Sequence, residues 1–164
     1  MLKRIMIVLA IMIGFFAHAK YTFSESHMEK WLVNLDSRIY SGDPNVCDAF
    51  TNDIEIEVYG KTNTEESLQI SGKDKWCPYL RLVGRGFSLA QIEITTSYDN
   101  LHVKPSKFPW REATVTYTET DKTSMQGAPT VEEVKEDTLV VVRTLKGLKI
   151  KSMESDIKSR RITN

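Results

Sequence analysis

The sequence predicts a single α+β domain in which a helical N-terminal third is followed by an antiparallel sheet. The prediction rests on a change in hydrophobic period along the chain. Apolar residues recur at spacings of three and four before residue 42, and they alternate with polar residues from residue 54 onward. The 164 residues contain no internal repeat, low-complexity tract or long linker, so one domain accounts for the chain after its leader.

The first 19 residues have the three parts of a cleavable secretory signal peptide. Lys3 and Arg4 form the positively charged start, residues 5–16 form an apolar run, and residues 17–19 supply the small-x-small pattern that signal peptidase recognises. The apolar run is shorter than the ~20 residues that a membrane-spanning helix needs. No cysteine follows the run, so a lipoprotein anchor has no attachment point.

We therefore expect cleavage between Ala19 and Lys20. The predicted organisation is a signal peptide over residues 1–19 and one domain over residues 20–164. This domain is expected to be periplasmic or secreted, with a membrane contact only during export. The alternative is an uncleaved leader that anchors the domain to the membrane.

The charge of the mature chain argues against a nucleic-acid partner. The leader holds two of the 22 basic residues and none of the 22 acidic residues, which leaves a net charge of −2. Phosphate backbones are bound by basic surfaces, and this balance does not supply one. The sequence also has no Gly-rich phosphate loop and no Gly-x-Ser-x-Gly elbow, so it gives no indication of nucleotide binding or of hydrolase chemistry.

Cys47 and Cys77 are the only cysteines, and an even number in an exported chain suggests one disulfide. Closing a loop of this span would stabilise the fold by roughly 3–4 kcal/mol. The alternatives are two free buried thiols or a metal site. A metal site is disfavoured because His27 and His102, the histidines of the mature chain, are not near a cysteine in sequence. We expect neither a metal nor another cofactor.

Residues 24–41 have the pattern of an amphipathic helix. Ser26 and Glu29 fit a capping box at its start, and Gly42 suits a left-handed residue at its end. The apolar face of this helix consists of Met28, Trp31, Leu32, Leu35 and Ile39.

Two shorter helical pieces are expected to carry the cysteines. Asp43 and Pro44 offer an N-cap and a first-turn proline for a short second helix that includes Cys47. Residues 71–83 are compatible with a third helix, and Pro78 favours a start near Cys77.

The remainder of the chain has the period of a sheet. Residues 139–142 form a β-branched run that predicts a strand covered on both faces, and residues 146–147 predict a tight hairpin turn after it. Residues 61–70 are polar and indicate a loop or a sheet edge. Period-two alternation predicts three further strands, over residues 54–59, 90–95 and 113–118.

This order of elements resembles that of the NTF2-like superfamily, whose members are also described as SnoaL-like or cystatin-like cones. The resemblance covers residues 24–157 and is one of pattern rather than of a signature sequence. Pro78 inside the third helix and Leu148 in place of a common aromatic residue depart from the family pattern. The resemblance rests on the opening helix ending in Tyr40-Ser41-Gly42-Asp43-Pro44, the short second helix with Phe50, the strand over 54–59, the helical segment over 71–83 and the final hairpin over 139–153.

The resemblance implies N-terminal helices packed on a strongly curved antiparallel sheet, with a cone-shaped cavity between them. Members of the family use the cavity for isomerase, dehydratase or cyclase chemistry, for binding small apolar ligands, or for neither. Many members dimerise through the sheet, so a homodimer is also implied. The fold therefore does not predict a particular reaction.

Ketosteroid-isomerase-like members of the family need a carboxylate base and hydrogen-bond donors that hold an oxyanion. No carboxylate or tyrosine here matches a catalytic motif position of the family, so the catalytic residues are unknown. Three of the carboxylates, Glu55, Glu57 and Glu93, alternate with core residues and are expected to face solvent. The groups available are the carboxylates of Glu55, Glu57, Glu93, Glu119 and Asp156 and the hydroxyls of Tyr40, Tyr59, Tyr98 and Tyr117.

Five side chains are expected to line a pocket if one exists. The tryptophans among them are more typical of core or cavity lining than of ligand stacking. His102 could act as a general base because histidine titrates near neutral pH, but no carboxylate lies nearby in sequence to orient it. The five are Trp31, Tyr59, Trp76, His102 and Tyr117.

The missing catalytic constellation favours a non-catalytic exported domain that binds a small apolar ligand or a protein partner. The second hypothesis is a cavity enzyme of the ketosteroid-isomerase or SnoaL type, and it predicts a buried carboxylate with a raised pKa. The third is an anchored component of an envelope assembly that resembles VirB8-type secretion proteins, and it requires a retained leader.

Overall fold

The computed structural model describes residues 2–61, 65–90, 92–125 and 127–161. Its helices are α1 (Leu2–Thr22), α2 (Glu25–Tyr40) and α3 (Lys73–Leu89). A 3₁₀ turn, η1 (Val46–Ala49), lies between α2 and the first strand. Its strands are β1 (Phe50–Lys61), β2 (Glu65–Ser71), β3 (Glu93–Pro105), β4 (Glu112–Ser124), β5 (Val131–Thr144) and β6 (Gly147–Arg161). The α+β class predicted from the sequence is confirmed.

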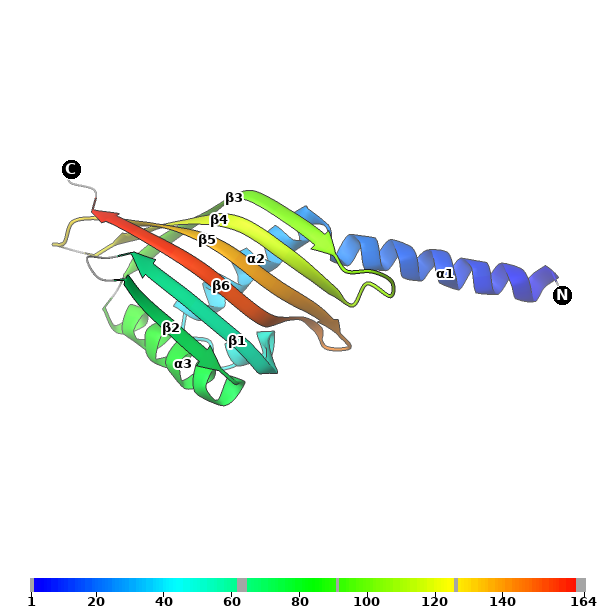
Figure 1. Ribbon diagram of the computed structural model, residues 1–164, viewed down its shortest axis with the longest axis horizontal. Helices are drawn as coiled ribbons and strands as arrows, with labels where there is room; N and C mark the ends of the chain where they lie inside the picture. The colour runs from blue at the N-terminus through cyan, green and yellow to red at the C-terminus, as the bar shows by residue number, and fades with distance from the viewer. Residues whose placement is uncertain (1, 62–64, 91, 126, 162–164) are drawn as a thin grey trace.

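The strands form one curved, unclosed sheet in the order β2-β1-β6-β5-β4-β3 (Figure 1). Strands β3 to β6 form the predicted antiparallel meander, and β2 pairs antiparallel with β1. The one exception is the parallel pair of β1 and β6, which places the first and the last strand of the chain side by side within the sheet.

The helices α2 and α3 cover one face of the sheet, which we call the inner face; the opposite face is the outer face. The inner face carries the alternating apolar residues of the strands, and these pack against the apolar face of α2. On α2, Met28, Leu32 and Leu35 are buried, while Trp31 and Ile39 are partly buried against the same core. The predicted helical stripe is therefore confirmed.

The start of α2 differs from the predicted capping box. Ser24 is the N-cap, and its hydroxyl accepts a hydrogen bond from the His27 amide. Ser26 and Glu29 consequently lie inside the helix. Gly42 does follow the helix with a φ of +69°, as its position predicted.

The third helix begins earlier than Pro78 suggested. It starts at Lys73 and contains Pro78, so the expectation of a start near Cys77 was wrong. Burial of Trp76 and Cys77 against the core holds this first part of α3 in place, although the proline removes one backbone hydrogen bond.

The two helices pack closely because Gly84 has no side chain. A Cβ at Gly84 would lie 2.6 Å from the Ile39 carbonyl oxygen and 2.9 Å from the Gly42 Cα. Backbone therefore meets backbone where the end of α2 contacts α3, and this contact fixes the position of the C-terminal turn of α2 over the sheet.

Several predicted boundaries shift. The second helix is only the 3₁₀ turn η1, and Phe50 already belongs to β1. The strand predicted over residues 90–95 begins at Glu93, because α3 continues to Leu89. Residues 65–71 form the edge strand β2. Residues 139–142 are fully buried only on the inner face, at Leu139 and Val141, so the prediction of a strand covered on both faces was wrong.

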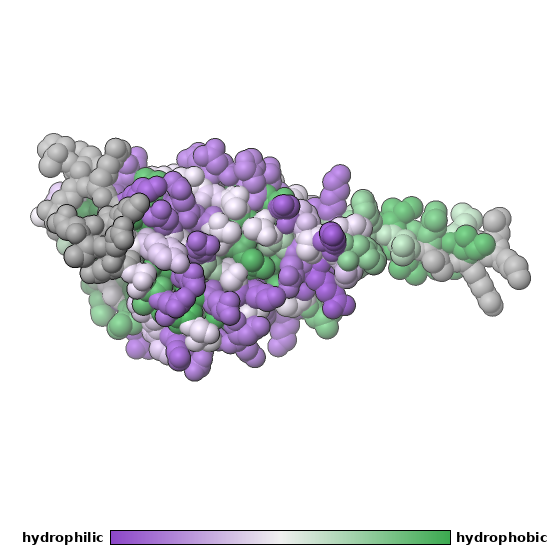
Figure 2. Space-filling model, viewed as in Figure 1, coloured by the Kyte–Doolittle hydropathy of each residue, from purple (hydrophilic) through white to green (hydrophobic). Residues whose placement is uncertain are grey.

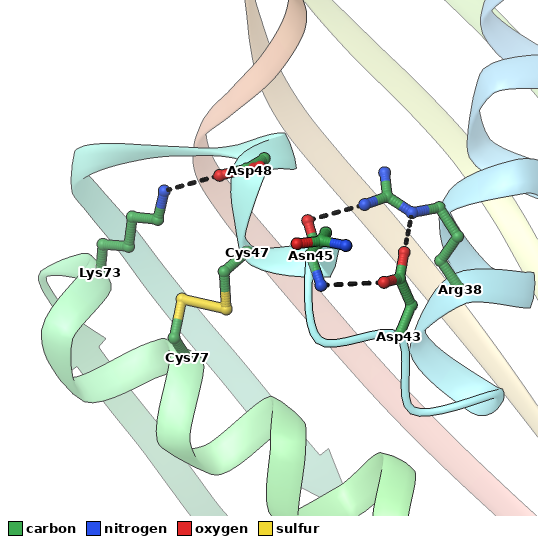
Figure 3. The surroundings of a disulfide bond; sticks show 7 residues. All are labelled: Arg38, Asp43, Asn45, Cys47, Asp48, Lys73 and Cys77. Atoms are coloured by element: carbon green, nitrogen blue, oxygen red, sulfur yellow. Dashed lines mark hydrogen bonds and ion pairs between the residues drawn. A yellow bond between two sulfur atoms is a disulfide. The ribbon is translucent and has the colours of Figure 1, made fainter.

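Cys47 and Cys77 are joined in a disulfide that links η1 to α3, with their Cα atoms 5.8 Å apart (Figure 3). Polar contacts surround the bond. Lys73 Nζ lies 3.9 Å from Asp48 Oδ1, and Arg38 Nε donates to Asp43 Oδ2 at 2.6 Å. The disulfide and the Lys73–Asp48 contact connect the irregular segment between α2 and β1 to α3. The Arg38–Asp43 ion pair connects the same segment to α2.

The apolar helix α1 projects from one end of the domain (Figures 1 and 2). The stretch of α1 over residues 5–22 is long and apolar enough to cross a membrane, and its large side chains are mostly exposed. The hydrophobic core cluster consists of residues from Phe23 onward, and of the described side chains of α1 only Ala19 and Thr22 near its end are buried. Cleavage between Ala19 and Lys20 stays a prediction.

Candidate functional site

The five residues predicted to line a pocket do not meet in one place. Trp76 packs in the core against Phe50, with ring centroids 6.0 Å apart. Trp31 lines a hollow of about 950 Å³ beside α1. The exposed His102 ring lies 3.5 Å from a Glu25 carboxylate oxygen. This carboxylate comes from α2, far from His102 in sequence.

Tyr59 and Tyr117 do line one hollow, of about 450 Å³, over β1, β6, β5 and β4. The Tyr59 side chain is 43% exposed and donates a hydrogen bond of 2.9 Å to Glu57. Tyr117 is buried, and its ring packs against Tyr98 on the inner face. The rest of this outer hollow is polar, and it is lined by Asn100, Thr116, Thr118, Glu136, Asp137, Thr138, Glu154 and Asp156.

A second group of functional side chains lies between α2 and the inner face of the sheet. We call it the interior cluster and define it as Asp36 and Tyr40 of α2, Thr96 of β3, Tyr117, Glu119 and Asp121 of β4, and Lys135 and Asp137 of β5. Strand pairing aligns its members, because Thr96 pairs with Asp121 and Tyr117 pairs with Asp137.

Lys135 is the centre of the interior cluster. Its ammonium donates to Glu119 Oε1 at 2.8 Å and also to Asp121 Oδ2. Asp121 receives two further hydrogen bonds, from the Tyr40 hydroxyl at 3.0 Å and from Thr96. The side chains of Glu119 and Asp121 are only 7% and 5% exposed, so the ion pairs are shielded from water.

Burial controls the protonation of this cluster. Burial raises the pKa of Asp36 to about 7 and that of Glu119 to about 8, although the Lys135 charge opposes both shifts. Burial also raises the pKa of Asp137. For Asp121, burial acts upward too, but Lys135 and Thr96 outweigh it and hold the pKa below its ordinary value.

The lysine and the two tyrosines of the cluster each keep a single charge state near neutral pH. Burial lowers the pKa of Lys135, but the carboxylates of Glu119 and Asp121 raise it by more, so the lysine stays charged. Burial raises the pKa of Tyr40 and of Tyr117, so both phenols stay neutral. Near neutral pH the cluster thus combines the Lys135 cation, the ionised Asp121 carboxylate and two carboxyl groups, those of Asp36 and Glu119, that titrate close to this pH.

Two carboxyl oxygens in this region lack a partner. Asp36 Oδ2 and Asp137 Oδ1 are buried without a hydrogen bond to any residue that the structure describes, and the same holds for the Tyr98 hydroxyl. Buried polar atoms are normally satisfied. Among the described residues, no group of three or more His, Cys, Asp and Glu side chains has an arrangement suited to a metal ion.

Sequence reasoning named three members of the interior cluster and missed five. Tyr40, Tyr117 and Glu119 were considered as donors or as a base. For one missed residue the sequence did contain a signal, since Asp121 continues the alternation of Val115, Tyr117 and Glu119 on the buried face. The missed residues are Asp36, Thr96, Asp121, Lys135 and Asp137.

Comparisons with known proteins address the fold. No protein-family model matches the chain, and no curated protein matches its sequence. The structure is similar to the β subunit of benzoate 1,2-dioxygenase from Burkholderia mallei, with a TM-score of 0.70 and 8% identity over 84% of this chain and 92% of that one. It is also similar to an NTF2-like protein with a cystatin-like fold from Novosphingobium aromaticivorans, with a TM-score of 0.64 and 13% identity over 91% and 87% of the two chains. The chain has the NTF2-like fold.

A third neighbour of this NTF2-like domain is a ketosteroid isomerase-like protein from Erwinia carotovora atroseptica. The TM-score is 0.52, with 13% identity over 81% of this chain and 92% of that one. The NTF2-like fold is therefore shared with proteins described by enzyme-like and by subunit roles, and at these identities the likeness extends to the fold alone.

Replacing Glu119 by glutamine is expected to raise the free energy of unfolding near pH 8 by about 1–3 kcal/mol. Because the folded pKa of Glu119 lies above its ordinary value, its contribution to stability is complete at acidic pH and is lost as pH rises toward about 8. Asp36 acts in the same direction up to about pH 7. Urea unfolding at about pH 5 and about pH 8 measures the change.

The matched control is Glu154→Gln, which removes an exposed carboxylate from the outer face. It should leave the pH dependence of the wild type unchanged. A Glu119→Gln chain that is less stable than the wild type at about pH 8 would show that the ionised carboxylate stabilises the cluster, contrary to this expectation.

Proposed function

We propose that this chain is an exported, non-catalytic NTF2-like domain that binds a protein partner on the outer face of its sheet. The observation that supports the proposal is that the side chains of the interior cluster contact one another and fill the space between α2 and the sheet. Lys135 fills the space between Glu119 and Asp121, and both carboxylates are almost completely buried. The interior is thus occupied by the chain's own side chains, and the outer face is left for binding.

The outer hollow supports this proposal. It brings the half-exposed ring of Tyr59 together with the carboxylates of Glu136, Glu154 and Asp156. An aromatic ring among acidic and hydroxyl groups suits a polar or basic segment of a partner, because tyrosine provides contact area and hydrogen bonding at small entropic cost. The similarity to a dioxygenase β subunit is consistent with a role in an assembly.

Export is supported by the leader and the disulfide. The apolar helix α1 lies outside the core, and the Cys47–Cys77 bond suits an oxidising compartment. We propose cleavage before Lys20 and a periplasmic or secreted domain. A chain recovered from the membrane with residues 1–19 retained would favour the anchored assembly component instead.

Photo-crosslinking in cells tests the binding face. Tyr59 is replaced by a photoreactive phenylalanine, and Tyr79 of α3 is replaced in the same way as the control. The two side chains are matched, since they are 43% and 42% exposed. We expect a discrete crosslinked product from position 59 and none from position 79.

The product's mass identifies its partner class, and a mass of two chains would indicate a homodimer through the sheet. Equal crosslinking from both positions, or none from position 59, would contradict the proposed face. Replacing Glu119 by glutamine in the same chain should leave the crosslink unchanged, since Glu119 does not line the outer hollow.

A cavity enzyme is the second candidate, and the interior cluster gives a specific reason for it. The enzyme hypothesis predicted a buried strand carboxylate with a raised pKa, and Glu119 has these properties. The unpartnered Asp36 oxygen is a group that a small polar ligand could satisfy. Native mass spectrometry distinguishes the two: a reproducible adduct that disappears in Glu119→Gln favours the enzyme, and an adduct-free chain favours the binding domain.

A further inference from the structure

The end of the domain from which α1 projects, which we call the α1 end, carries unpaired positive charge. It is formed by the connection between β3 and β4 and by the turn between β5 and β6. Lys107, Arg111 and Lys146 are exposed there, and none has a carboxylate partner in the described part of the chain. The backbone hydrogen bond from the Arg143 amide to the Arg111 carbonyl, of 2.7 Å, holds the two segments together.

Carboxylates at the α1 end do not neutralise this charge, because they already contact other groups. Glu112 is paired with Lys151 at 3.2 Å, and Asp48 lies near Lys73. Elsewhere on the domain two exposed lysines are paired: Lys122 lies 3.9 Å from Glu132, and Lys158 lies 3.0 Å from Glu136. The cations of the α1 end are distinguished by the exposed apolar side chains that stand beside them.

Apolar side chains stand among these cations at the tips of both segments. Leu145 is fully exposed and immediately precedes Lys146, while Phe108 is 68% exposed and follows Lys107. The Trp110 ring lies between Phe108 and Phe16 of α1, with both pairs of ring centroids 5.1 Å apart. Exposed aromatic and aliphatic tips flanked by basic residues are typical of surfaces that enter the boundary between headgroups and acyl chains.

The position of α1 identifies the surface that this end faces. Its residues 5–22 are the one described stretch that is long and apolar enough to span a bilayer. At this end α1 contacts Trp110 of the β3–β4 connection through Phe16 and Arg143 near the end of β5 through Phe15. Figure 2 shows hydrophilic residues gathered where the apolar helix meets the domain. A chain delivered across a membrane through α1 therefore presents its α1 end to that membrane first.

We propose that the α1 end is a membrane-surface site that binds the anionic headgroups of phospholipids. Lys107, Arg111 and Lys146 contact the phosphates, and Phe108 and Leu145 enter the interface. The hollow of about 950 Å³ beside α1, lined by Arg111, Arg143 and Lys146, admits a headgroup between the two segments. The site holds the domain at the membrane after export and does not depend on the partner proposed for the outer face.

Vesicle flotation of the chain that begins at Lys20 tests the proposal without the contribution of α1. This chain retains the hydrophobic core cluster, which starts at Phe23. We expect it to float with vesicles that contain phosphatidylglycerol and to stay unbound with phosphatidylcholine alone. Binding should weaken as salt is added, because exposed charges are screened.

Two triple variants with the same change in net charge make the test specific. Lys107→Gln/Arg111→Gln/Lys146→Gln removes the cations of the α1 end and is expected to weaken binding by about tenfold or more. Arg85→Gln/Lys122→Gln/Lys158→Gln removes three exposed cations elsewhere and should bind as the wild type does.

Leu145→Ser tests the apolar contact separately and should weaken binding without altering its salt dependence. The proposal is overturned if the wild type binds neither vesicle, if it binds both equally, or if the two triple variants lose binding to the same extent. Circular dichroism and urea unfolding of each variant establish that it is folded.

Discussion

Replacing Lys135 by methionine is expected to lower the free energy of unfolding by about 3–5 kcal/mol near neutral pH. The substitution removes the only cation that contacts Glu119 and Asp121 in the described part of the cluster, and both carboxylates are almost completely buried. A buried charge without its partner keeps the cost of leaving water and loses the attraction that offsets it. Urea unfolding at neutral pH measures the loss.

The same variant should recover part of its stability at about pH 5, because Glu119 and Asp36 bind protons well above their ordinary pKa values. Adding Glu119→Gln to Lys135→Met should also recover part of the loss above about pH 8, where the Glu119 carboxyl begins to carry an unpaired charge. This coupling would identify the ion pair, rather than lost packing, as the cause.

Lys158→Met is the matched control. Lys158 is also paired with a glutamate, Glu136, but both side chains are about half exposed or more. Exposed pairs contribute about 0–1 kcal/mol, so the control should be nearly neutral. Equal losses in the two variants would refute the argument that burial makes Lys135 important.

Removing the disulfide is expected to lower the free energy of unfolding by roughly 3–4 kcal/mol. The bond closes a loop with a sequence separation of 30, which spans η1, β1, β2 and the start of α3. Freeing this loop increases the conformational entropy of the unfolded chain. The variant Cys47→Ala/Cys77→Ala, compared with the wild type in urea, measures the effect.

A reducing agent supplies the internal control. It should destabilise the wild type by a similar amount and leave the alanine variant unaffected. A wild-type chain whose unfolding midpoint does not respond to reductant would contradict a stabilising bond between Cys47 and Cys77.

Much of the fold could be predicted from the sequence because hydrophobic period reports directly on burial. The stripe of α2 and the alternation at Ala113, Val115 and Tyr117 both correspond to the observed core. Boundaries were less accurate where a local rule competed with packing. Pro78 favours a helix start, but burial of Trp76 and Cys77 on the core extends α3 to Lys73.

The interior cluster was harder to predict because polar residues on a strand are normally assigned to solvent. Asp36 lies on the same face of α2 as Leu32 and Leu35, and Asp137 continues the inner-face alternation of β5. These positions show that the carboxylates point inward. Their partner Lys135 depends on the register between β4 and β5, which the sequence alone does not establish.

The central position of β6 determines when this sheet can be completed. Residues 147–161 lie between β1 and β5, although they follow the other five strands in the sequence. A chain that lacks them has two open strand edges facing each other, each able to pair with another molecule. The sheet is therefore completed only once β6 is available to pair with both of its neighbours. For the exported domain that we propose, this order would keep the polypeptide unfolded during its passage through a translocation channel.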